Sequence, residues 1–260
     1  MKIIVCVKQV PDAKDVRLDP KTNTLAREGV QSIMNPYDQH ALEEAVRLKD
    51  ELGAEVTVLT MGPPQAEDVL RQSIACGADH GVLVSDRAFA GADTWATSYT
   101  LAQAIDFLGG ADLVLCGKQA IDGDTAQVGP GLAMRLDMPF ITCIQKVREA
   151  DASGLVAERM MDDGYDVVAV DYPVLLTVVK DLNTPRVPSL KGKMRAKKAQ
   201  FQVLSAADIG ADPSLIGLAG SPTQVVRVFP PKPRGERTVL TGDMDEQVSE
   251  LARRLNAYLQ

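Results

Sequence analysis

Hydrophobic positions in the first 140 residues follow two alternating spacings. Short continuous apolar runs occupy residues 3–7, 56–61, 82–84 and 113–116. Between the runs, apolar residues recur every three or four positions, in stretches at 41–52, 66–74 and 95–108. The runs predict buried strands, and the stretches predict helices that bury one face. Strands that are apolar on both faces and separated by helices indicate a mostly parallel sheet covered on both sides, which is a doubly wound α/β fold.

The pattern changes after Pro139. Strand-like apolar segments then follow one another at residues 140–147, 155–160 and 167–179. Because no clear helix separates them, they predict antiparallel additions to the sheet. Further on, residues 220–235 are rich in Pro and Gly and predict a linker, while apolar spacing over 248–259 predicts a terminal helix. We expect an α/β domain over 1–220 and a C-terminal extension over 221–260.

Composition narrows the function mainly by exclusion. The chain is 45% hydrophobic and 24% charged, with a net charge of −7, which is typical of an ordinary soluble protein and not of a nucleic-acid binder. No stretch approaches the roughly 20 apolar residues of a membrane helix, and the first residues lead into a strand and not into a signal peptide. We expect a cytoplasmic protein without membrane insertion or nucleic-acid binding.

Cysteine and histidine usage argues against a metal site. The four cysteines are Cys6, Cys76, Cys116 and Cys143. They are far apart and form no CxxC pair, so we expect reduced and mostly buried thiols without a zinc site or a disulfide framework. His40 and His80, the two histidines, have no obvious partner in the sequence, and a catalytic His needs one. We interpret them as a helix-start residue and a strand-start residue.

A glycine-rich segment, Gly117–Gly131, leaves the buried strand at 113–116 and leads into a helix predicted to begin near Ala126. Glycines let the backbone approach a ligand, and the free N–H groups of a helix start favour an anion. The spacing matches neither the Walker pattern nor GxGxxG, so a phosphate cradle and an ordinary loop stay equal alternatives. Asp122 and Asp124 argue against both side chains contacting phosphate, and Asp124 or Thr125 is an alternative helix cap.

The segment Asn35–Asp38 precedes the first helix. Pro36 suits the first helical position and Asp38 is placed to cap the helix, so a capping turn is the default interpretation. In a parallel sheet, however, this turn would lie at the same edge as the strand ends at Cys6 and Met61 and the loop after Gly117. Ligands of doubly wound folds bind at that edge, where an adenosine would lie.

The segment 186–198 holds six basic residues and no acidic one. These residues are Arg186, Lys191, Lys193, Arg195, Lys197 and Lys198. One interpretation is a solvated basic loop. The other is a patch that attracts an acidic protein partner and sets the association rate more than the affinity, with Leu190 and Met194 as apolar anchors.

Taken in order, these segments resemble the β subunit of electron-transfer flavoproteins over essentially the whole chain. The stretch Ala157-x-Arg159-x-x-Asp162-Asp163-Gly164-x-Asp166-x-Val168, followed by Pro173–Thr177, resembles the signature of that family. It departs at Asp166, where the family usually carries Glu or Gln. The segment 182–198 resembles the partner-recognition loop of the family. The resemblance implies an adenine-nucleotide α-hydrolase or Rossmann-like fold and an electron carrier.

The resemblance also implies which residues bind the cofactor. Carried over residue by residue, the nucleotide positions of the family fall on Cys6, Asn35, Pro36, Tyr37, Asp38, Met61, Gly117, Lys118, Gln119, Ala120, Ile121, Asp122, Gly123, Asp124, Thr125, Ala126, Gln127 and Val128. Residues 8–12, 35–38 and 122–130 resemble the electron-bifurcating branch, in which the β subunit holds a second FAD. We therefore favour FAD over AMP at this site. In this family another FAD is held mainly by the α subunit.

The implied partners follow from the same resemblance. They are an α subunit in a heterodimer and an acyl-CoA dehydrogenase or other dehydrogenase, with ferredoxin and a quinone oxidoreductase as further candidates. The implied partner-binding residues are Leu190, Lys191, Lys193, Met194 and Arg195. We expect electron transfer, extended to flavin-based bifurcation in the complex, and no self-sufficient catalyst. The alternative is a stand-alone AMP- or ATP-binding regulatory protein of similar fold.

Overall fold

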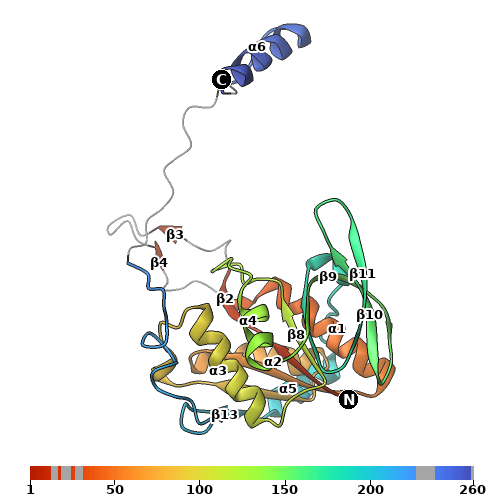
Figure 1. Cartoon of the computed structure of the whole chain (residues 1–260), viewed down its shortest axis with the longest axis vertical. Helices are drawn as coiled ribbons and strands as arrows, with labels where there is room; N and C mark the ends of the chain where they lie inside the picture. Colours follow the sequence, from red (N-terminus) through yellow and green to blue (C-terminus); the bar gives the residue numbers. More distant parts are fainter. Residues whose placement is uncertain (13–16, 19–24, 27–31, 227–237, 259–260) are drawn as a thin grey trace. The chain divides into compact units, whose positions relative to one another are not determined.

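The computed structural model describes residues 1–12, 17–18, 25–26, 32–226 and 238–258. The chain divides into two compact units, Met1–Val226 and Arg227–Gln260. Much of the predicted linker, residues 227–237, lies outside the described residues. The larger unit contains the sheet and its covering helices (Figure 1).

The described residues form one main sheet of nine strands. Its strands are β1 (Lys2–Cys6), β6 (Glu55–Met61), β7 (His80–Val84), β8 (Leu113–Gly117), β9 (Phe140–Ala150), β10 (Gly154–Met160), β11 (Tyr165–Asp171), β12 (Val174–Val178) and β13 (Gln202–Leu204). Their order is β11-β10-β9-β12-β8-β1-β6-β7-β13. The neighbouring strands in the part of the sheet β9-β12-β8-β1-β6-β7-β13 are parallel. At the other end of the sheet, β10 pairs antiparallel with both β9 and β11. The predicted parallel sheet with antiparallel additions is confirmed.

Helices cover both faces of this sheet. They are α1 (Pro36–Leu52), α2 (Glu67–Cys76), α3 (Thr94–Phe107), α4 (Val128–Arg135) and α5 (Leu190–Lys198). Successive strand residues point to opposite faces, so Ile3 and Val5 join a core cluster with α1, α2 and α5, while Ile4 joins a second cluster with α3 and α4. This two-sided burial explains why the strands read as continuous apolar runs.

Shorter elements complete the larger unit. Among the residues that the structure describes, two strand pairs lie outside the main sheet, β2 (Gln9–Pro11) with β5 (Ser32–Met34) and β3 (Arg17–Leu18) with β4 (Leu25–Ala26). The same residues include the short 3₁₀ turns η1 (Pro64–Ala66), η2 (Arg87–Phe89) and η3 (Lys180–Leu182). Strand β2 follows β1 in the chain and β5 precedes α1, so their pairing connects the end of β1 with the start of α1.

Two predicted segments differ from the structure. The single strand predicted over 167–179 is two strands, β11 and β12, which are separated by Tyr172 and Pro173. A proline has no N–H to donate to a ladder, so it stands between β11 and β12. The segment 182–198, expected to be a loop, ends in helix α5, whose Ser189 side chain accepts a hydrogen bond from Gly192 N at 3.0 Å.

The smaller unit contains α6 (Met244–Asn256), within the stretch whose apolar spacing predicts a terminal helix. Asp243 and Glu246 form a capping box at its start. Its apolar residues Met244, Val248, Leu251 and Leu255 are exposed. Across the described ranges, no helix is long and apolar enough to cross a membrane.

Candidate functional site

Three neighbouring strands end at one edge of the sheet and define the site. Strands β8, β1 and β6 are adjacent, with Cys6 in register with Cys116 on one side and with Leu59 on the other. Their carboxyl ends therefore bring Gly117, Cys6 and Met61 together. The first turn of α1 lies over the same edge, because Asn35 N donates to the carbonyl of Lys8 at 2.9 Å.

The side chain of Asp38 joins these segments. It is 6% exposed and accepts three hydrogen bonds, from Lys8 N at 2.7 Å, from Gly117 N at 3.2 Å and from Asn35 Nδ2 at 2.9 Å. The predicted helix cap at Asp38 is wrong. Asn35 is the residue at the N-cap position, Pro36 takes the first helical position as expected, and the Asp38 carboxylate binds the ends of β1 and β8.

The electrostatic setting of Asp38 follows from its burial. Burial raises the pKa of this carboxyl to about 7, although the hydrogen bonds from Asn35, Lys8 and Gly117 lower it. All three partners are N–H donors, which suit the ionised form. Next to it, a hydrogen bond with Cys6 together with burial raises the pKa of the Cys116 thiol well above its usual value. The four cysteines, all in the described segments, are free thiols, and Cys6 and Cys116 are buried.

Asn35 connects the same edge to the loop after β8. Its Nδ2 donates to Gln119 O at 2.9 Å, and its Oδ1 accepts from Ile121 N at 3.2 Å. Lys8 Nζ binds the carboxylate of Asp122 at 2.7 Å. The loop is thus fixed to α1 and to the end of β1 before it reaches its outer part.

The outer part of the loop is open and has unusual backbone geometry. Asp124 and Ala126 have φ angles of 53° and 54°, in the left-handed region that is sparsely populated by residues other than glycine. Asp124 N donates to Ala120 O at 2.8 Å, and the Asp124 carboxylate accepts from the side chain of Gln119. Helix α4 begins at Val128, two residues later than predicted, and its N-cap Gln127 makes no side-chain cap. Neither Asp124 nor Thr125 caps it.

Two glycines of this segment have opposite environments. A Cβ at Gly117 would overlap Asp38 Oδ1 and lie 2.6 Å from Tyr37 Cβ, so Gly117 is needed for the close approach of α1 to β8. A Cβ at Gly123 would meet no protein atom within 4 Å. Gly123 therefore faces open space, and only a ligand would detect a side chain there.

The structure brings most of the implied nucleotide residues to one edge, in the order set by the strands. Cys6 and Met61 end β1 and β6, residues 35–38 start α1, and residues 117–128 connect β8 to α4. The side chain of Met61 packs against the α3 side of the core. The thiol of Cys6 is buried, so its backbone is the part that reaches the edge.

Sequence reasoning missed several contacts at this edge. The amino group of Lys8 binds the carboxylate of Asp122, and its backbone N–H donates to Asp38. Lys180 lies over the ring of Tyr37, with 4.8 Å from Nζ to the ring centre. The available signal for Lys8 was its position directly after the first buried run.

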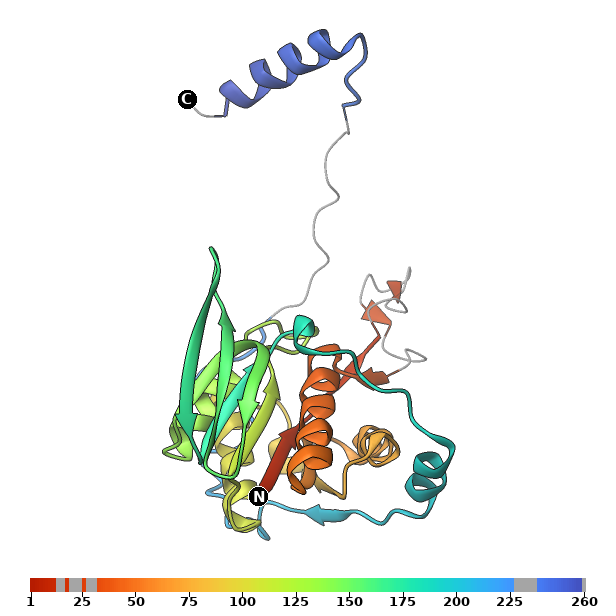
Figure 2. The same ribbon diagram turned by 90° about the vertical axis from the view of Figure 1, so that its right-hand side faces the viewer.

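The segment 182–198 forms the second candidate surface. Figure 2 shows it leaving β12, passing α1 and ending in α5. The exposed apolar residues are Val187, Leu190 and Met194, at 85%, 78% and 58%. Lys191 and Lys193 are exposed as well. This combination of an apolar ridge and basic groups is suited to an acidic protein surface.

The basic residues of this segment are not equivalent. The expectation that all of them form one patch facing a partner is therefore wrong for two arginines. The guanidinium of Arg186 binds Glu43 at 2.9 Å and Asp50 at 3.0 Å. Arg195 Nη2 donates to the carbonyls of Ile74 and Ala78, at 2.7 Å each. Both arginines thus make bonds within the chain. A hollow of about 540 Å³ between this segment and the end of α2 is lined by Lys191 and Met194, among others.

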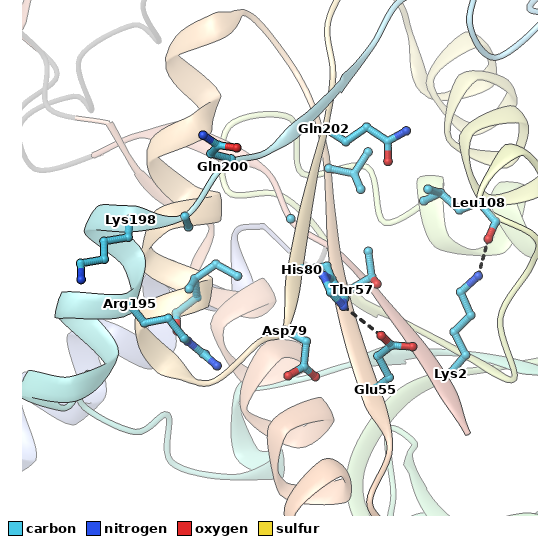
Figure 3. A pocket seen from close by; sticks show the side chains of 14 residues that line it. Lys2, Glu55, Thr57, Asp79, His80, Leu108, Arg195, Lys198, Gln200 and Gln202 are labelled. Atoms are coloured by element: carbon cyan, nitrogen blue, oxygen red, sulfur yellow. Dashed lines mark hydrogen bonds and ion pairs between the residues drawn. The ribbon is translucent and has the colours of Figure 1, made fainter.

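A larger hollow of about 610 Å³ lies at the opposite, amino edge of the sheet (Figure 3). There, His80 Nε2 lies 2.9 Å from Glu55 Oε1, and Lys2 Nζ donates to the carbonyl of Leu108. His80 starts β7 as expected, and His40 lies in the first turns of α1 with its Nδ1 3.0 Å from the carbonyl of Asn183. Each histidine therefore has a structural partner. Because ligands of such folds bind at the carboxyl edge, this hollow is not the candidate site.

The fold and the edge formed by β8, β1 and β6 define a doubly wound α/β protein of the kind that binds its ligands at the carboxyl ends of parallel strands. Residues 22–209 match the family model described as "Electron transfer flavoprotein domain". The chain belongs to the electron-transfer flavoprotein family and functions in electron transfer, as its resemblance to the β subunits implied.

The relatives agree with this assignment. The chain is 50% identical over 258 residues to electron transfer flavoprotein subunit beta of Thermoanaerobacterium thermosaccharolyticum, covering 99% of this chain and 98% of the relative. It is 52% identical over 250 residues to the caffeyl-CoA reductase-Etf complex subunit CarD of Acetobacterium woodii, covering 96% and 95%. It is 46% identical over 266 residues to protein FixA of Azorhizobium caulinodans, covering 98% and 95%. The alternative of a stand-alone regulatory protein is not favoured.

Proposed function

We propose that this chain is the β subunit of a heterodimeric electron carrier and holds a second FAD at the edge formed by β8, β1 and β6. The observation that carries this proposal is the attachment of the loop after Gly117 to Asn35 and Lys8, which leaves Gly123 and the uncapped start of α4 open to a ligand. Free N–H groups at a helix start and a glycine without steric neighbours suit the pyrophosphate of a dinucleotide.

The residues of this chain would act by binding and orientation. Val128 N and Gly129 N, at the uncapped start of α4, supply donors for phosphate oxygens. Lys8, which lies 2.7 Å from Asp122 of the same loop, would supply positive charge. Bound FAD would accept electrons and pass them on, whereas AMP at the same site would be structural only.

Nucleotide extraction tests this proposal. The purified heterodimer is denatured, and the released FAD and AMP are quantified against protein. Two FAD and no AMP per heterodimer support the proposal, whereas one FAD and one AMP would assign the chain to the carriers with a single flavin.

A matched pair of variants links the nucleotide to the loop. Gly123→Leu should lower the content of the β-subunit nucleotide and leave the flavin of the α subunit in place, because it fills space that only a ligand would use. Gly164→Leu is the control, since a Cβ at Gly164 also meets nothing within 4 Å and lies at the β10–β11 turn. Equal nucleotide content in both variants would contradict the proposed site.

We further propose that an α subunit and an electron-transfer partner cover two exposed apolar surfaces. The stripe Met244, Val248, Leu251 and Leu255 lies on one side of α6, which is typical of a helix that packs on another chain. Leu190 and Met194 would dock a dehydrogenase. Equal amounts of the two subunits in the purified complex are expected, and a stable, fully active homodimer of this chain would contradict the heterodimer.

The identity of the electron-transfer partner extends this proposal. An acyl-CoA dehydrogenase is the first candidate, and the match to a caffeyl-CoA reductase-Etf complex subunit supports a partner of the acyl-CoA type. Bifurcation would follow if both flavins are present, with ferredoxin or a quinone oxidoreductase as acceptor. Reduction of a low-potential acceptor by the complex only in the presence of a second, high-potential acceptor would support it.

A further inference from the structure

We propose that Arg195 is a positioning residue, which orients helix α5 for docking through its bonds to α2 and does not itself supply a contact to the partner. This inference rests on the proposed docking of Leu190. It changes the role of Arg195 from the one implied by the family resemblance. The relevant partner is a protein surface with an apolar pocket and an acidic rim.

The first step is a reciprocal pair of caps between α2 and α5. Arg195 Nη2 on α5 donates to Ile74 O in the last turn of α2 and to Ala78 O, two residues after this helix, at 2.7 Å each. In return, Arg71 Nη1 on α2 donates to Ala196 O at the end of α5 at 2.8 Å. Ile74 O and Ala196 O accept backbone bonds of 3.3 Å from Gly77 N and Ala199 N, and they carry partial negative charge at the helix ends. Each guanidinium therefore adds a second, charged donor at the end of the neighbouring helix.

The second step is the tight contact between the two helices. Gly192 and Ala196 are four residues apart and lie on the same face of α5. Ala196 is 7% exposed and joins the core, and a Cβ at Gly192 would overlap the carbonyl oxygen of Ala75. The orientation of α5 is therefore fixed by close packing as well as by the two caps.

This orientation places the apolar ridge outward. Leu190 and Met194 are also four residues apart, on the side of α5 away from Gly192 and Ala196. They are 78% and 58% exposed, so the inner contacts leave them free for a partner. Figure 3 shows Arg195 on α5 with its guanidinium directed toward Asp79.

The approach to α5 is fixed independently. Arg186 N donates to Glu43 Oε2 at 2.9 Å, and Asn183 Nδ2 donates to His40 O at 3.1 Å. Both partners belong to α1. The segment before α5 is thus attached to α1, while α5 itself is attached to α2. Rigid presentation of an anchor lowers the entropic cost of docking, so loss of the Arg195 contacts should weaken binding although Leu190 remains.

Ionic strength separates a positioning role from a charge role. The experiment uses the full heterodimer with an acyl-CoA dehydrogenase as probe, and measures KM and kcat for reduction of the heterodimer at low and high salt. Arg195→Ala should raise KM about tenfold at both salt concentrations with kcat unchanged, because preorganisation is not screened. Lys191→Ala, the control on the exposed side of α5, should raise KM only a few-fold at low salt and hardly at high salt.

Two further variants keep the test decisive if Arg195→Ala has a wider effect. Gly192→Ala removes no charge but pushes α5 away from Ala75, and should also raise KM independently of salt. Arg195→Lys can still donate to Ile74 O and Ala78 O, and should recover most of the affinity. Amide hydrogen exchange in α5 should be faster in Arg195→Ala than in the parent, while the nucleotide content stays the same.

The outcomes distinguish this inference from the proposed docking surface. If Leu190→Ala leaves KM unchanged, the docking surface is wrong. If Leu190→Ala raises KM but Arg195→Ala and Gly192→Ala do not, the docking surface stands and the positioning role is wrong. A KM increase in Arg195→Ala that disappears at high salt, as in Lys191→Ala, would make Arg195 a charge contact and overturn the inference as well.

Discussion

Helix α1 carries two carboxylates that hold two different regions of the molecule. Asp38 holds the ends of β1 and β8 through backbone N–H groups and the amide of Asn35. One turn further on, Glu43 holds the docking segment through the backbone and guanidinium of Arg186. Asp38 is buried with uncharged donors, whereas the Glu43 side chain is 13% exposed and the Arg186 side chain 35% exposed.

The difference shows how one helix supports a rigid site and an adaptable surface. A buried acceptor with several donors is costly to remove, because each donor loses its partner away from water. A partly exposed ion pair is replaced by water at little cost. We therefore expect the sheet edge to be the less tolerant region and the docking segment the more tolerant one.

The largest expected effect is that of Asp38→Ala. It removes the acceptor of three N–H groups, and at ~1 kcal/mol for each unpaired donor the free energy of unfolding should fall by about 3 kcal/mol. Urea denaturation of the purified protein at about pH 4, where the pH-dependent contribution of Asp38 is still present, measures it. The control is Asp122→Ala, which breaks only an exposed pair with Lys8. Equal losses in the two variants would remove the distinction between buried and exposed carboxylates.

The pH dependence of stability sharpens the same point. The pKa of Asp38 is raised to about 7 by burial, from its usual value of 3.8. Between about pH 4 and 7 the folded state therefore binds a proton that the unfolded state has released. In this window the contribution of Asp38 to the free energy of unfolding should fall as pH rises, by up to about 1.4 kcal/mol per pH unit.

This contribution is measured as the difference between the parent and Asp38→Ala. The contribution should be fully present below about pH 4 and lost as the pH rises through about 7. Denaturation curves at several pH values across this window give the difference directly. A constant difference between the two proteins would mean that Asp38 is ionised throughout.

Gly117, at the end of β8, and Gly123, in the loop that follows, test the edge by side-chain size alone. Gly117→Ala should cost about 2 kcal/mol of unfolding free energy, because its Cβ would overlap Asp38 Oδ1 and crowd Tyr37. Gly123→Ala should change it by less than about 0.5 kcal/mol, since the new methyl group meets nothing. Thermal unfolding of both variants under one set of conditions gives the comparison. A large loss in Gly123→Ala would show that the outer loop is packed.

Much of the fold could be predicted from the sequence, because buried parallel strands and one-sided helices have distinct apolar spacing. The candidate edge could be predicted as well, since the carboxyl ends of neighbouring parallel strands meet. The role of Asp38 could not. Its partners Lys8 and Gly117 are 30 and 79 residues away, and only the assembled sheet brings them together.

The docking segment was harder to predict for the same reason. Six basic residues within the thirteen positions 186–198 indicate a charged surface. They do not indicate which of these side chains bind other groups of the same chain. Arg186 and Arg195 bind groups that are 143 and 121 residues away in the sequence. Charge patterning therefore predicted the surface, and tertiary contacts decided the role of each residue on it.

Of the carboxylates Asp38 and Glu43 on α1, Glu43 is expected to contribute less to stability, and Glu43→Ala should cost less than Asp38→Ala or Gly117→Ala. Arg186 is partly exposed and keeps its contact with Asp50, so water replaces Glu43 and the free energy of unfolding should fall by only about 1 kcal/mol or less. Local order should change more than global stability, because Arg186 N also loses its acceptor. Hydrogen exchange at residues 186–189 should accelerate, with nucleotide content and the exchange of β1 unchanged. If Glu43→Ala instead destabilises the protein as much as Asp38→Ala, the two carboxylates of α1 are equivalent, and the docking segment is as integral to the fold as the sheet edge.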